Sequence, residues 1–77
     1  MKVKVEIVGL LHIPGFKNNS SIEVPPNTSI SGLYNELKIM RDHQKFITPF
    51  INGVEVKKGA EIKDGDTVKF FLPTGGG

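Results

Sequence analysis

The sequence contains no cysteine and no tryptophan, and only two of its residues are histidines. The lack of cysteine excludes disulfide frameworks, thiolate nucleophiles, cysteine-ligated zinc and iron–sulfur clusters. No apolar run approaches the roughly 20 residues that a membrane-spanning helix needs. Lysine and valine alternate at residues 2–5, where a signal peptide has a continuous apolar stretch. We therefore expect a cytoplasmic protein without membrane contact.

An excess of charge of one sign is also lacking. Ten basic and eight acidic side chains leave a formal net charge of +2. The lysines are scattered and Arg41 is the only arginine, so the sequence lacks the basic, aromatic-rich pattern of nucleic-acid-binding proteins. The length of 77 residues allows one small domain and no second core. These properties argue against a nucleic-acid partner and against a multi-residue enzyme.

The residues that are present predict two strands and then a helix. Apolar and polar residues alternate over Lys2–Val8 and again over residues 20–24, with a long turn-rich loop at 9–19 between them. Polar residues at 27–29 offer N-cap oxygens for a helix that begins near Ile30. Its apolar stripe is Ile30, Leu33, Tyr34, Leu37 and Met40.

Three further strands are predicted in the second half of the chain. Residues 46–51 are rich in β-forming residues and predict one strand. The hairpin signal Asn52-Gly53 follows, and residues 54–56 are predicted to form the second strand of the hairpin. Residues 67–72 alternate again after a turn at 64–66. The order strand, strand, helix, strand, strand, strand predicts an α+β fold, a mixed sheet of about five strands covered by one helix. This is the β-grasp, or ubiquitin-like, architecture.

Conventional catalytic groups are missing from the sequence. His12 and His43 have no partner at metal-ligand spacing, and the turn at Asp64 and Asp66 has too few ligands for calcium. The glycines at 75–77 are not followed by the lysine and helix of a phosphate-binding loop. We therefore expect neither a metal nor a bound cofactor.

The end of the chain is the strongest functional candidate. We expect a β-grasp domain at residues 1–73 and a flexible glycine tail at 74–77, Thr74-Gly75-Gly76-Gly77. A carboxylate on an arm without side-chain bulk can be threaded through a narrow channel into the active site of another protein. A frayed terminus without function is the alternative interpretation.

Here the chain resembles a known family. The Asn52-Gly53 hairpin, the stretch from Asp64 to Pro73 and the closing Gly76-Gly77 are similar to those of the MoaD/ThiS group of ubiquitin-like sulfur carriers. The resemblance covers nearly the whole chain. In length and in its long first loop, the sequence is most similar to the small subunit of molybdopterin synthase.

The resemblance implies a protein substrate and synthase subunit, not an enzyme. The carboxylate of Gly77 would be adenylated by a ubiquitin-activating-like enzyme that itself uses ATP, and then converted to a thiocarboxylate. A sulfur-accepting synthase, such as the molybdopterin synthase large subunit, would be the second partner. Thiamine thiazole synthesis, isopeptide-forming protein modification and a plain interaction module remain alternatives. We expect the free protein to be a monomer.

Partner recognition is expected on the sheet face that the helix leaves uncovered. If Val68, Phe70 and Leu72 point into the core, Lys69 and Phe71 point outward. Either Phe50 or Ile47 should also face outward. The alternative is that Phe71 packs under the first loop, beside Leu10, Leu11 or Phe16. The expected partner-binding residues are Phe71, Pro73, Thr74, Gly75 and Gly76.

Overall fold

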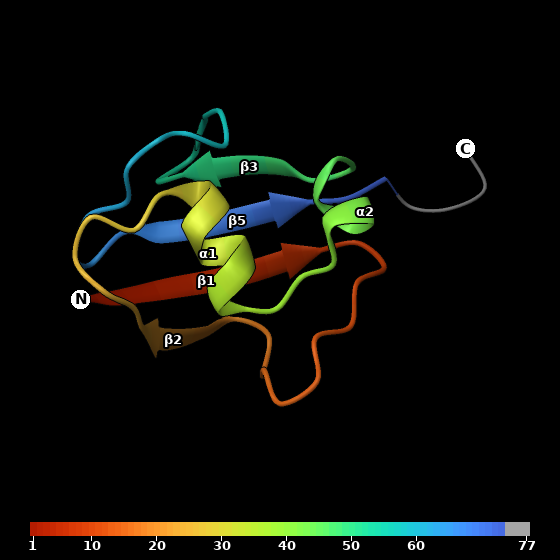
Figure 1. Cartoon of the computed structure of the whole chain (residues 1–77), viewed down its shortest axis with the longest axis horizontal. Helices are drawn as coiled ribbons and strands as arrows, with labels where there is room; N and C mark the ends of the chain where they lie inside the picture. Colours follow the sequence, from red (N-terminus) through yellow and green to blue (C-terminus); the bar gives the residue numbers. More distant parts are fainter. Residues whose placement is uncertain (74–77) are drawn as a thin grey trace.

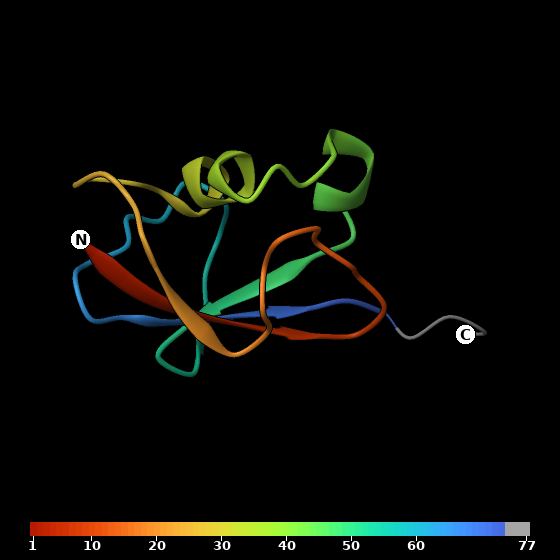
Figure 2. The same cartoon turned by 90° about the horizontal axis from the view of Figure 1, so that it is seen from below.

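The computed structural model describes residues 1–73, and its centre is a five-stranded sheet in the order β2-β1-β5-β3-β4 (Figure 1). The strands are β1 Lys2–Val8, β2 Ser20–Glu23, β3 Thr48–Ile51, β4 Val54–Glu55 and β5 Thr67–Phe71. The helices are α1 Ile30–Glu36 and α2 Arg41–Gln44. Both helices lie on one side of the sheet, and no helix within residues 1–73 covers the other side (Figure 2). The predicted mixed sheet and its β-grasp order of elements are confirmed.

The two central strands, β1 and β5, are parallel, and all other neighbours are antiparallel. Val5 lies opposite Val68, and Ile7 lies opposite Phe70. Because side chains alternate along a strand, these four residues face the helices and are buried, whereas Lys69 and Phe71 face the uncovered side. The alternation seen in the sequence therefore determines which residues each face of the sheet presents.

One apolar core fills the space between the sheet and α1. Phe70 and Tyr34 form an aromatic pair whose ring centroids are 5.2 Å apart. Ile13, from the first loop, belongs to this core as well. The core residues are Val3, Val5, Ile7, Ile13, Val24, Ile30, Leu33, Tyr34, Leu37, Ile39, Ile47, Ile62, Val68 and Phe70.

The helix begins where the sequence predicts and ends earlier. The Ser29 side chain caps the first turn by accepting a hydrogen bond of 3.1 Å from the amide of Gly32. After Glu36 the chain turns, because Lys38 adopts a left-handed φ of 58°. Ile39 is thereby directed into the core, while Met40 is 62% exposed. The prediction that Met40 belongs to the buried stripe of this helix was wrong.

Two polar side chains replace missing strand partners. Beside β1, the Asn18 carboxamide accepts from the amide of Ile7 at 2.7 Å and donates to the same residue's carbonyl at 2.9 Å. The Asn18 side chain thus bonds to the amide and the carbonyl of Ile7, which lie beyond the last residue pair between β1 and β2. At the other end of the sheet, the Asn52 carboxamide donates to Asp66 at 2.9 Å and accepts from the amide of Thr67 at 2.9 Å. These bonds fix the first loop and the start of β5.

Among residues 1–73, the structure contains no helix of the length and apolar character needed to cross a membrane. α1 has seven residues and α2 has four. Both serve to cover the sheet.

The core of α1 gives a stability prediction. Replacing the fully buried Leu33 by alanine should lower the free energy of unfolding by about 2–5 kcal/mol, because it leaves a cavity between helix and sheet. Urea unfolding followed by circular dichroism measures this loss. The matched control is Val54→Ala on the exposed strand β4, which should cost less than about 1 kcal/mol. Equal losses for both variants would contradict the assigned core.

Candidate functional site

The candidate site begins where the chain leaves the central strand β5. The amide of Leu72 donates a hydrogen bond of 2.8 Å to the carbonyl of Val8, one residue beyond the last register pair, Val8 and Phe71. β1 and β5 run in the same direction and end near α2 (Figure 1). Pro73, the last residue described, is exposed. The segment that leads to the C-terminus is therefore held by β1 up to Leu72.

Gly9 makes this close pairing possible. Its φ is +129°, a conformation that residues with side chains rarely adopt. A Cβ atom at this position would lie 2.8 Å from the Cβ of Leu72 and 2.9 Å from its carbonyl oxygen. A glycine at the end of β1 is thus required for the last contact that positions the chain before the tail.

Apolar side chains surround the same exit point. Leu10 is 81% exposed and Phe46 is 55% exposed, which is unusual for residues of this size. They contribute to a hollow of about 180 Å³ beside Pro73. We call it the exit hollow, and its lining is Leu10, Leu11, His43, Phe46, Leu72 and Pro73. Sequence reasoning did not identify this hollow; its one signal was a Leu-Leu pair in a loop otherwise rich in turn residues.

The uncovered face of the sheet carries a second group of side chains. The rings of Phe50 and Phe71 meet edge to face, with centroids 5.1 Å apart. The Lys69 ammonium lies 5.6 Å from the centre of the Phe71 ring and 3.7 Å from the Glu6 carboxylate. We call Glu6, Phe50, Lys69 and Phe71 the sheet-face cluster. A hollow of about 500 Å³ adjoins it, completed by Asn52, Gly53 and Thr67.

The structure decides the orientations that the sequence left open. Phe71 is 38% exposed and is absent from the core. Phe50 is the outward residue of the pair considered, because Ile47 is buried. Leu11 and Phe16 pack against the core from the first loop, whereas Phe71 contacts Phe50 and Lys69. An aromatic pair on an uncovered sheet face has the character of a protein-docking surface.

The described residues offer little to bind a metal. Within residues 1–73, no group of three or more histidine, aspartate or glutamate residues is placed to hold a metal ion. His12 lies exposed in the first loop, and His43 lies exposed on α2. The predicted tail residues Thr74, Gly75, Gly76 and Gly77 lie outside the described residues, so their roles remain predictions.

Comparison with protein families decides the relationship. The model of the ThiS family matches residues 10–77, which is nearly the whole chain. The chain belongs to the ThiS family. It is therefore a member of the ThiS/MoaD group of β-grasp sulfur carriers, whose members act as protein substrates. A comparison with curated protein sequences gives no match.

Solved structures agree with this ThiS-family fold. A putative molybdopterin converting factor subunit 1 from Pyrococcus furiosus is 27% identical, with 95% of this chain and 98% of that chain covered and a TM-score of 0.65. SAMP1 from Haloferax volcanii is 16% identical over the whole of both chains, with a TM-score of 0.75. A chain from the complex of subunits 1 and 2 of the Helicobacter pylori molybdopterin-converting factor is 21% identical over the whole of both chains, with a TM-score of 0.66.

The contact between Gly9 and Leu72 gives a second stability prediction. Gly9→Ala should lower the free energy of unfolding by about 1–3 kcal/mol, because the new methyl group collides with Leu72 and the backbone conformation is unfavourable. The measurement is the urea midpoint at constant m-value. Gly59→Ala is the matched control, since a Cβ there has no neighbour within 4 Å, and its stability should change by less than about 1 kcal/mol. If Gly9→Ala proved as stable as Gly59→Ala, the contact would not constrain the exit.

Proposed function

We propose that this ThiS-family protein carries sulfur as a thiocarboxylate on Gly77, made after a partner enzyme adenylates the C-terminal carboxylate. The supporting observation is that the family match runs to residue 77, where the chain ends in three glycines. The preceding segment is anchored to the sheet up to Leu72. The sulfur would thus be carried at the end of three consecutive residues without side chains.

The proposed chemistry needs no cysteine in this chain. The Gly77 carboxylate attacks the α-phosphorus of ATP, which forms an acyl adenylate and releases pyrophosphate. A nucleophilic sulfur from a donor then displaces AMP at the carbonyl carbon. Where the donor is a persulfide, the product is an acyl disulfide, and thiol reductants cleave its sulfur–sulfur bond to give the thiocarboxylate and the donor thiol while they are themselves oxidised to a disulfide. ATP and the catalytic groups belong to the partner enzyme, and this chain supplies the reacting carboxylate.

The sheet-face cluster is the proposed docking surface for the activating enzyme. Phe71 lies two residues before Pro73 on the strand that leads to the tail. A partner that binds Phe50 and Phe71 would therefore hold the carrier beside the segment that it must activate. The partly exposed Lys69–Glu6 pair contributes little to stability at such a site, and would serve to orient the partner.

Molybdopterin synthesis is the proposed destination of the sulfur. One similar structure is described as a putative molybdopterin converting factor subunit 1, and another is a complex of subunits 1 and 2 of such a factor. By analogy, the second partner of this carrier would be a synthase large subunit. Thiazole synthesis and isopeptide formation use the same activated carboxylate and are distinguished by experiment.

Intact-mass measurement tests the proposed carrier function. The protein is incubated with ATP, a sulfur donor and an extract of its source cells. We expect a mass increase equal to the replacement of one oxygen by sulfur. Deletion of Gly76 and Gly77 should abolish this increase without changing the circular dichroism spectrum, because the core described within residues 1–73 is complete without them.

Other outcomes of the mass experiment lead to different functions. Adducts of higher mass, with Gly-Gly remnants on lysines after digestion, would indicate a protein modifier. An unchanged mass under conditions that convert a known carrier would overturn the proposal and favour an interaction module. If the thiocarboxylate forms, adding molybdopterin precursor with the large subunit, or the thiazole-forming enzyme, identifies the acceptor that consumes it.

The docking surface gives a separate prediction. Phe71→Asp should lower the rate of thiocarboxylate formation at limiting carrier concentration by about tenfold or more, because it removes an aromatic anchor and buries a charge in the interface. The domain should stay folded, since Phe71 is outside the core. Val54→Asp, an exposed position on β4, is the control and should react at the normal rate. Loss of the circular dichroism signal in Phe71→Asp would assign Phe71 a structural role instead.

A further inference from the structure

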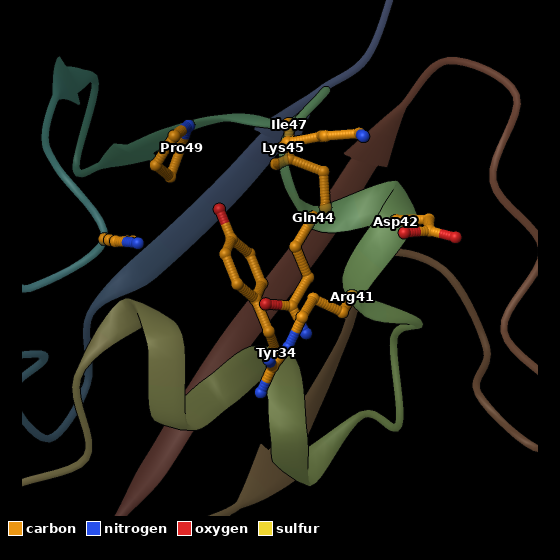
Figure 3. A pocket seen from close by; sticks show the side chains of 8 residues that line it. Tyr34, Arg41, Asp42, Gln44, Lys45, Ile47 and Pro49 are labelled. Carbon is orange, nitrogen blue, oxygen red and sulfur yellow. The ribbon is translucent and has the colours of Figure 1, made fainter.

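A second surface of interest lies on the helix side of the sheet. A hollow of about 450 Å³ opens between α1, α2 and the start of β3 (Figure 3). Its volume is within the range of binding pockets in proteins. We call it the helix-face hollow, and its lining is Tyr34, Arg41, Asp42, Gln44, Lys45, Ile47, Pro49 and Lys58.

The charge of this hollow is strongly positive for so small a protein. Arg41, Lys45 and Lys58 contribute three cations against the single carboxylate of Asp42. The resulting excess of two positive charges equals the formal net charge of the whole chain, +2. Asp42 points away from Tyr34, toward the outside of the hollow (Figure 3).

None of the three cations is held in an ion pair within the described residues, and the Lys45 ammonium lies 5.7 Å from the centre of the Phe46 ring. All are exposed, and within residues 1–73 none of them lies within 4.0 Å of a carboxylate oxygen. Elsewhere in the same part of the chain, Lys63 and Lys69 do have such partners, at 3.2 and 3.7 Å. Binding an anion at the hollow would thus break no existing ion pair.

The floor of the hollow is apolar and fixed. Ile47 and Pro49 are buried, and the ring of Tyr34 is held against Phe70. The Tyr34 hydroxyl points into the hollow (Figure 3). This phenol is a neutral hydrogen-bond donor at physiological pH, and burial raises the pKa of Tyr34 further, to about 12. The hollow thus combines an apolar floor with a cationic rim.

We propose that the helix-face hollow binds an acidic segment of a partner protein. Carboxylates of that segment would pair with Arg41 and Lys58 at the rim, and with Lys45 once its ammonium leaves the Phe46 ring. An apolar or aromatic side chain between them would lie on the floor formed by Tyr34, Ile47 and Pro49. Complementary charge and an apolar floor are what such a segment requires.

Other anions fit the hollow less well. A small phosphate is bound by several convergent donors, frequently main-chain amides, whereas these cations are spread on long side chains around a wide rim. A single-stranded nucleic acid needs a series of aromatic rings for its bases, and Tyr34 is the one aromatic residue of the lining. An acidic peptide matches both the spread of charge and the apolar floor.

The proposed site is separate from the tail chemistry. The two helices that contribute to the helix-face hollow lie on one side of the sheet (Figure 2), whereas Lys69 and Phe71 of the sheet-face cluster face the uncovered side. A partner at the hollow therefore leaves Phe50 and Phe71 accessible. The proposal does not depend on thiocarboxylate formation and is tested without the activating enzyme.

NMR titration of the labelled protein tests this site. The probe is the peptide Glu-Glu-Tyr-Glu-Glu with blocked termini, added at low ionic strength. We expect saturable shifts confined to the amides around Tyr34, residues 41–45 and Lys58. The double variant Arg41→Glu/Lys58→Glu should weaken binding by about tenfold or more, because two attractive charges become repulsive.

The control is a second double variant with the same net charge as Arg41→Glu/Lys58→Glu, but with both substitutions outside the hollow. Lys4→Glu/Lys17→Glu changes two exposed lysines outside the hollow and should leave the affinity within about twofold. Equal weakening in both double variants, or no saturable shift at the hollow, would overturn the proposal. Tighter binding of inorganic phosphate or of a short oligonucleotide to the same amides would also overturn it, and would identify a different ligand class.

Discussion

The parallel pairing of β1 with β5 is the interaction on which the rest of the structure depends. It joins the first strand of the chain to the last, and its register places Val5 beside Val68 and Ile7 beside Phe70. These four residues form the base of the core on which α1 lies. The same pairing continues through the bond from Leu72 to Val8 and so fixes where the chain leaves the sheet. Core and exit point are thus set by one strand pair.

The sheet separates two surfaces of different character. The uncovered side presents an aromatic pair, and the helix side presents a cationic hollow with an apolar floor. The uncovered side is formed by every second residue of the strands. The helix side is formed by the helices together with the intervening strand residues. In so small a domain, one sheet thus supplies a separate surface for each of the two proposed partners.

The strands and the helix start could be predicted from the sequence because they depend on local signals. Alternation in β1 and β5 and the polar cap at Ser29 were sufficient. The end of α1 could not be predicted, because apolar spacing continues to Met40 while the left-handed turn at Lys38 interrupts the helix.

The candidate site was only partly predictable for the same reason. The outward direction of Phe71 follows from alternation along one strand. The contact of Gly9 with Leu72, the exit hollow and the helix-face hollow all join residues far apart in sequence. Patterns among neighbouring residues of the sequence do not predict such contacts, because the contacts arise from the tertiary arrangement of the loops and α2.

The central position of β5 has a consequence for biosynthesis. β5 is the last strand to be made, yet it lies between β1 and β3 and contributes Val68 and Phe70 to the core. A nascent chain therefore cannot complete its sheet until residues 67–71 have left the ribosome, and contacts between such distant segments form slowly. Chains truncated before this point lack the centre of the fold and are exposed to proteases. Every molecule that completes this sheet therefore contains β5, the strand that leads to the C-terminus.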